Sequence, residues 1–254
     1  MRSTPIPDWL QNGEDFGEEG VELALDWCLV RVAQLRSGWQ KLAGLLKSGS
    51  IPNRECSQDE LRVISKEAHD LNCSLLQWAA NIPKNGMFTT QTVPGWPSEF
   101  GNISYHGTMH VYPDLQCAAT WNRYRGARLV TNAIILLASV ASDKAGGYIC
   151  QESLTERDMA FSTIRDLVDD ICASVAFHFG EPDDSILEKL AKIRGNSTSS
   201  AQQVFPLVFP LLISAHVPGL SVNQRSWIKD QLMLVSKVTG SGVLELLAGG
   251  NQAK

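Results

Sequence analysis

The chain has 254 residues, of which 44% are hydrophobic and 19% are charged, and its net charge is −5. This composition is that of an ordinary globular protein, long enough to bury a core without disulfides or metal. Nucleic-acid-binding domains usually present a basic face, so the acidic balance argues against binding of DNA or RNA by the whole surface. We therefore expect no nucleic-acid partner.

The first fifty residues predict a lead-in followed by a helix. Residues 1–17 are polar and rich in Pro and Gly, which predicts a flexible segment, and one domain is expected over residues 18–250. From Glu18 to about Ser48 the apolar residues recur at spacings of three and four. That period is typical of a helix with one buried face.

A second helix and a long loop follow. Ser57 and Glu60 match a capping box, in which each side chain bonds to the backbone N–H near the other, so a helix is predicted from Ser57 to just before Pro83. Residues 82–112 are rich in Pro, Gly and Thr. They predict a loop that contains at most a short hairpin, and loops of this length are usually functional or disordered.

The next helix is the longest one predicted, from about Pro113 to Ser142. Pro in the first turn and Asp114 near the positive helix end both favour this start. The run 129–140 has no polar face for nearly three turns. We therefore expect this helix to be central and largely buried.

The C-terminal part predicts further helices. Residues 179–202 are polar, with a flexible tip predicted at 195–200. The predicted helices cover Leu154–Phe177, Val204–His216 with irregular first turns at Pro206 and Pro210, the stretch from a Ser221 cap to Gly240, and one or two turns at Val243–Leu247. The predicted fold class is all-α, a single domain of about seven helices around the long central one.

The six cysteines indicate no metal site. The closest two, Cys56 and Cys73, are 17 positions apart, whereas zinc ligands normally include pairs two to four residues apart. We expect reduced structural thiols, no metal and no cofactor. The N-terminus has no apolar signal-peptide core, and the apolar windows 129–140 and 204–217 are too short to span a bilayer. The expected location is cytoplasmic or nuclear, without a membrane partner.

Four polar or aromatic residues cluster on one side of the predicted long helix: Trp121, Asn122, Arg125 and Arg128. As a candidate ligand pocket, they would form a polar floor in which an Arg holds a carboxylate or enolate. The structural alternative is a network in which the two arginines pair with acids such as Asp166, Asp169 or Asp170. We favour the structural alternative, because charges this close to a buried stripe must be paired.

The histidines are the other candidates. His106 and His110 are four residues apart, which on a helix would suit acid–base or metal chemistry, but Gly107 and Pro113 argue against a continuous helix there. Solvent-facing loop histidines are the simpler interpretation. His178 and His216 each end a predicted helix, where an imidazolium favours the negative end of the helix dipole.

Several motifs in order resemble the regulatory region of fungal zinc-cluster transcription factors, over roughly residues 20–250. The motifs are Trp78-x3-Ile82-Pro83, the strip Tyr112-Pro-Asp-Leu, Trp121-Asn-x-Tyr-Arg-x2-Arg128, Ile171-Cys-Ala-Ser-Val-Ala-Phe177, Phe209-Pro-Leu211, Gln224-Arg-Ser-Trp227 and Gly240-x-Gly242. The resemblance implies a helical regulatory body that senses a small molecule or contacts partner proteins.

The departures from the family pattern concern DNA binding and two helix positions. The family's DNA-binding module has six closely spaced cysteines beside basic residues, and nothing in this sequence matches it. This chain has Ala176 where the family usually has Pro, and Phe209 where it usually has Trp. The resemblance therefore suggests a C-terminal fragment, a truncated paralogue or a reused scaffold.

Two functions remain open at this point. The first is a regulatory or interaction module that does not itself bind DNA. The second is a reused helical scaffold that binds a hydrophobic secondary metabolite, or acts on it as a cofactor-free cyclase or isomerase. Hydrolase, metalloprotease, P-loop and dinucleotide-binding motifs are all absent from the sequence. That absence argues against a cofactor-dependent enzyme, whereas a cofactor-free cyclase or isomerase leaves little motif. The missing DNA-binding module favours the second function, but we favour the first on balance.

Overall fold

The structure is a computed structural model that describes residues 20–48, 54–92, 104–144, 151–179 and 198–242. The predicted lead-in at 1–17 and the terminal turns at Val243–Leu247 lie outside these residues. The chain divides into two compact units, one formed by residues 1–82 and 127–164 and the other by 83–126 and 165–254. Two long helices, α3 (Leu115–Lys144) and α4 (Gln151–Phe179), each contribute to both units.

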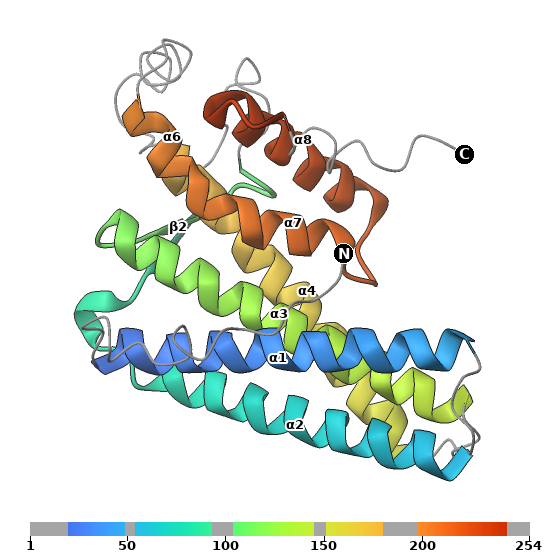
Figure 1. The fold of residues 1–254 in the computed structure, drawn as a ribbon. Helices are drawn as coiled ribbons and strands as arrows, with labels where there is room; N and C mark the ends of the chain where they lie inside the picture. The colour runs from blue at the N-terminus through green and yellow to red at the C-terminus, as the bar shows by residue number, and fades with distance from the viewer. Residues whose placement is uncertain (1–19, 49–53, 93–103, 145–150, 180–197, 243–254) are drawn as a thin grey trace. The chain divides into compact units, whose positions relative to one another are not determined.

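The first unit is built on α1 (Gly20–Ser48) and α2 (Arg54–Ala80), which run side by side (Figure 1). Their apolar stripes supply its core, and the indole Nε1 of Trp78 donates to the carbonyl of Val21 at 2.7 Å. A smaller cluster of Leu42, Leu61 and Ala138 lies among partly buried apolar side chains.

The second unit contains the short elements. It holds the 3-10 turns η3 (Lys84–Gly86) and η5 (Phe205–Leu207), the strands β1 (Thr89–Thr92) and β2 (Thr108–Val111), and the helices α6 (Thr198–Val204), α7 (Val208–His216) and α8 (Val222–Thr239). The strands pair antiparallel, with Thr90 opposite His110. In β2 the two middle residues are buried and the two end residues partly exposed.

The all-α class is confirmed, since α-helices account for most of the described residues and the hairpin is the one sheet in that part of the chain. Three predicted helix ends are also confirmed by their caps. Asp114 accepts from the Cys117 N–H at 2.7 Å, and Ser221 accepts from the Gln224 N–H at 3.1 Å. Gly240 ends α8 in the left-handed conformation with φ 67°, which glycine adopts without strain.

Two predicted boundaries were wrong. Helix α2 begins at Arg54, so Ser57 lies inside the helix and not at its cap. Arg and Glu are good helix formers and allow the earlier turn. In the polar stretch 179–202, residues 198–202 belong to α6, which η5 then follows at Pro206, whereas Pro210 lies in the first turn of the regular helix α7. The polar composition concealed a helix whose final residue, Val204, is fully buried.

Helix α3 has 30 residues and is therefore much longer than the apolar run 129–140 within it. By length and composition it could cross a membrane, although the run 129–140 alone could not. Most of its apolar window is buried inside the protein, and core helices of globular proteins commonly pass the same test. The expected burial of this run is confirmed, with Leu137 as the residue most exposed.

Candidate functional site: the Arg125 cluster

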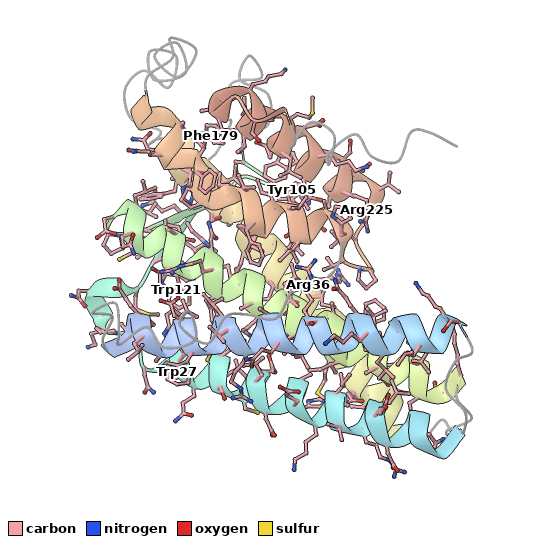
Figure 2. All side chains as sticks on the ribbon, viewed as in Figure 1. Trp27, Arg36, Tyr105, Trp121, Phe179 and Arg225 are labelled. Carbon is pink, nitrogen blue, oxygen red and sulfur yellow. The ribbon has the colours of Figure 1, made fainter. Side chains whose placement is uncertain are left out.

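Arg125 is a buried charge on α3 in the second unit. Its side chain is 1% exposed, and its guanidinium carbon lies 4.7 Å from the centre of the Phe88 ring and 5.7 Å from those of Tyr112 and Trp121. Guanidinium groups are attracted to aromatic faces at such distances. Trp121 is fixed in turn by donating its Nε1–H to the Gly86 carbonyl at 2.8 Å (Figure 2).

The two terminal nitrogens of Arg125 donate to three neighbouring side chains. Nη1 donates to the Tyr112 hydroxyl at 2.5 Å and to Asn122 Oδ1 at 3.2 Å, and Nη2 donates to His110 Nδ1 at 3.2 Å. Because arginine has no acceptor and keeps its proton, His110 Nδ1 must be the accepting nitrogen. The hydrogen bonds therefore define the His110 tautomer.

Asp170 of α4 is the negative charge beside Arg125. Its Oδ2 lies 3.6 Å from Arg125 Nε, which has no hydrogen-bond partner in the structure, and its Oδ1 lies 3.7 Å from His110 Nε2. The carboxylate is 46% exposed, so water competes with the arginine for it. Partial burial raises the pKa of Asp170, and the Arg125 charge acts against that rise.

A chain of hydrogen bonds between neutral groups continues from Arg125 within the second unit. Asn122 Nδ2 donates to His178 Nε2 at 3.2 Å, and His178 Nδ1 donates to the Gln203 carbonyl at 2.7 Å. Burial lowers the pKa of His178 to about 4. His178 is therefore neutral near pH 7, and the predicted imidazolium at the end of the helix was wrong because desolvation outweighs the helix dipole.

The two candidate loop histidines lie in different environments. His106 is exposed, has a φ of 56° and contacts the ring of Tyr105 with centroids 4.1 Å apart, so it is solvent-facing as expected. His110 is 3% exposed in β2, so the solvent-facing interpretation was wrong for it. Burial and the nearby Arg125 charge lower the pKa of His110 to about 3.

The structure thus brings together four of the six predicted site residues: His110, Trp121, Asn122 and Arg125. Arg128, one turn beyond Arg125, belongs to the first unit, where its Nε donates to Asn72 Oδ1 at 3.3 Å. Asn132 donates to the same oxygen at 3.1 Å. Arg128 and the exposed His106 are therefore outside what we call the Arg125 cluster.

The remaining members of that cluster were not predicted as site residues. They are Phe88, Tyr112, Asp170 and His178. Asp170 was one of three acids considered as a partner for the arginines, and it is the one whose carboxylate lies beside Arg125. Phe88 precedes β1 in the Pro- and Gly-rich segment, and no periodic pattern there indicates which aromatic residue is buried.

The cluster has limited scope for proton transfer. Arg125 remains charged, both buried histidines are neutral, and burial raises the pKa of the Tyr112 hydroxyl despite the neighbouring arginine. Asp170 combines partial exposure with a raised pKa, so it is the group best placed to exchange a proton with solvent. Among the described residues, no three His, Cys, Asp or Glu side chains lie together so as to hold a metal ion.

Comparison with known proteins agrees with the motif resemblance. The chain is 26% identical over 243 residues to the transcription factor dbaG of Emericella nidulans, in an alignment that covers 89% of this chain and 51% of that protein. The chain therefore spans about half the length of the relative it matches. No family model and no solved structure matches it. Over most of its length the chain is similar to a fungal transcription factor.

Proposed function

We propose that this chain is a regulatory module of the fungal transcription-factor type, which acts through a partner protein and does not itself bind DNA. The observation that carries the proposal is the similarity to a transcription factor along 89% of the chain. The widely spaced cysteines and the net charge of −5 support the absence of DNA binding, since the sequence has neither zinc-cluster spacing nor a net positive charge. The same similarity favours the nucleus as its location.

The Arg125 cluster has a structural role in this proposal. A buried guanidinium with three hydrogen-bonded side chains and three aromatic neighbours joins α3 to α4 and to the hairpin within the second unit. The three hydrogen-bonded side chains fix the position of the guanidinium, although its Nε has no hydrogen-bond partner. The cluster would therefore hold the second unit in a single conformation.

A tethering assay tests the regulatory role. The chain is fused to a heterologous DNA-binding domain in a fungal host that carries a reporter gene behind the matching sites. We expect reporter transcription to rise or fall relative to the DNA-binding domain alone. A fusion that accumulates to the same level, enters the nucleus and leaves transcription unchanged in both an inactive and an active reporter would contradict the proposal.

A metabolite-binding or isomerase role is a second candidate, favoured by one observation. Asp170 is half-exposed, its pKa is raised, and it lies 3.7 Å from the buried His110. Carboxyl groups with raised pKa values are common in acid–base sites. This role requires the Arg125 cluster for binding or turnover and not only for stability. Measurements of stability and of metabolite binding on the Arg125→Ala variant separate these two cases.

A further inference from the structure

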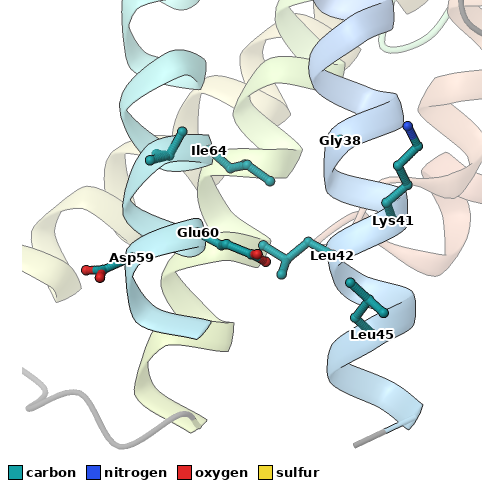
Figure 3. Close-up of a pocket in the computed structure, with 8 residues that line it drawn as sticks. Gly38, Lys41, Leu42, Leu45, Asp59, Glu60 and Ile64 are labelled. Carbon is teal, nitrogen blue, oxygen red and sulfur yellow. The ribbon is translucent and has the colours of Figure 1, made fainter. Parts of the chain in front are cut away.

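Helices α1 and α2 of the first unit border a surface groove of about 430 Å³. The residues that line it are Gly38, Lys41, Leu42, Leu45, Asp59, Glu60, Val63 and Ile64 (Figure 3). All of them belong to the first unit, and none belongs to the Arg125 cluster. The groove is therefore separate from the candidate site described above.

The groove presents apolar side chains to solvent. Leu42 is buried, whereas Leu45 is 44% exposed and Val63 is 65% exposed. Large apolar side chains at this exposure gain free energy when a second surface covers them. Single exposed apolar side chains are common on protein surfaces, but Leu45 and Val63 line the same groove, which distinguishes it from ordinary surface.

Gly38 leaves space in the α1 wall of the groove. It lies in the interior of a 29-residue helix, where glycine is less favourable than alanine. A Cβ atom built at Gly38 meets no atom of the described residues within 4 Å, so no packing in that part of the chain explains the missing side chain. Glycine permits another chain to approach a helix closely.

Two side chains of opposite charge lie at the groove. Lys41 lies on α1 with its amine on the side away from α2, and Glu60 reaches from α2 toward α1 (Figure 3). Neither has an ion pair with another residue of the described chain, whereas Asp59 points away from α1 and lies 3.5 Å from Arg62. An occupant that lies over α1 would therefore find the unpaired Glu60 carboxylate on the side of α2 and the unpaired Lys41 amine on its other side.

We propose that this groove binds one amphipathic helix of a partner protein. The helix would place its apolar stripe over Leu45 and Val63, with an acidic residue toward Lys41 and a basic residue on its other flank. A helix is about 10–12 Å wide, so the groove volume accommodates the side chains of one stripe and not a whole helix. A small ligand fits less well, because such ligands are mostly enclosed by their sites.

Helix binding at this groove rests on the proposed function, because it would be the contact between the regulatory module and its partner protein. Its test measures binding directly, so a chain that regulates transcription but does not bind a helix, or the reverse, would separate the two proposals. The probe is a panel of labelled helical peptides of about five turns. Each has a leucine stripe at helical spacing, acidic residues on one flank and basic residues on the other, in either orientation.

Fluorescence anisotropy with the full chain should show binding by one flank orientation, with a scrambled peptide of the same composition as control. Gly38→Leu should weaken binding at least roughly tenfold by filling the groove. Gly44→Leu is the matched control and should bind like the parent, because Gly44 also lies in α1, also has open space at its Cβ and does not line the groove.

Charge reversal tests the orientation. Lys41→Glu together with Glu60→Lys should transfer the preference to the peptide with the opposite flanks. Val63→Asp, at an exposed position that tolerates a polar residue, repeats the groove test if Gly38→Leu fails to fold. The proposal is overturned if no peptide of the panel binds, if Gly38→Leu and Gly44→Leu weaken binding equally, or if the charge reversal leaves the preference unchanged.

Discussion

Replacing Arg125 by alanine should destabilise the fold by about 3–5 kcal/mol. The substitution removes the donor of three buried acceptors, the Tyr112 hydroxyl, Asn122 Oδ1 and His110 Nδ1, and each buried group left unsatisfied costs about 1–3 kcal/mol. The Tyr112 hydroxyl, 3.4 Å from His110 Nδ1, can replace part of this loss. It also removes the cation beside the rings of Phe88, Tyr112 and Trp121. Recovery of the hydration energy of the guanidinium offsets part of this loss, and Asp170 is exposed enough to be solvated by water.

The assay is urea unfolding followed by circular dichroism, with a thermal melt in parallel. For a chain of this size the expected loss corresponds to a fall in Tm of roughly 6–20 °C. Arg123→Ala is the control, since Arg123 lies on the same helix, is partly exposed and donates to Thr120, and it should change stability by less than about 1 kcal/mol. The reasoning fails if the Arg125 variant melts like the parent. If that variant also loses binding or turnover of a hydrophobic metabolite, Arg125 is a site residue.

Three features of the second unit, and the net charge of the whole chain, give further predictions. Stability should fall as pH drops from about 6.5 toward 4. The folded-state pKa values of His110 and His178 are about 3 and about 4, below the unfolded value of 6.5, so the unfolded chain binds more protons in that window. A Tm that stays constant between these pH values would contradict this prediction. Gly126→Ala should destabilise by about 1 kcal/mol, because its Cβ would lie 2.8 Å from the Phe209 ring, and should become neutral or stabilising beside Phe209→Ala, as a double-mutant cycle would measure. Asp170→Asn should cost only about 1 kcal/mol in urea unfolding, since the carboxylate is half-exposed and makes no hydrogen bond to Arg125 Nε, and a loss equal to that of the Arg125 variant would refute this. Gel-shift titration at physiological salt should show no sequence-selective DNA binding by the acidic chain, and sub-micromolar selective binding would overturn that part of the proposed function.

The long helices were predictable because their apolar residues recur at spacings of three and four. This spacing places them on one face of a helix, whereas in a strand they would be divided between two faces. The errors lie where that signal is weak. Helix α2 gained a turn before Ser57 because nothing in Arg54 or Glu55 opposes a helix. Helix α6 begins in a Ser- and Thr-rich stretch, and its tie to the second unit is tertiary, through the hydrogen bond between the Gln203 carbonyl and His178. Composition alone does not report such a contact.

The candidate site was predictable only on the helix that carries most of it. Trp121, Asn122 and Arg125 share one side of α3 because helical geometry places them there. His110 was misjudged because β2 has only four residues, too few for an alternating pattern to show which side is buried. Phe88 and His178 join the cluster through the packing of separate segments, which no local pattern specifies.

The direction of the hydrogen bonds bears on which function the Arg125 cluster supports. Every hydrogen bond from Arg125 to Tyr112, Asn122 and His110 starts at a cation that cannot give up its proton, and the chain onward through His178 ends at a backbone carbonyl. A proton arriving at the accepting nitrogen of His110 or His178 would displace a hydrogen bond that stabilises the core. The cluster is therefore arranged to keep one protonation state, which suits a rigid regulatory body better than an acid–base site. An enzymatic role would have to depend on the half-exposed Asp170 alone.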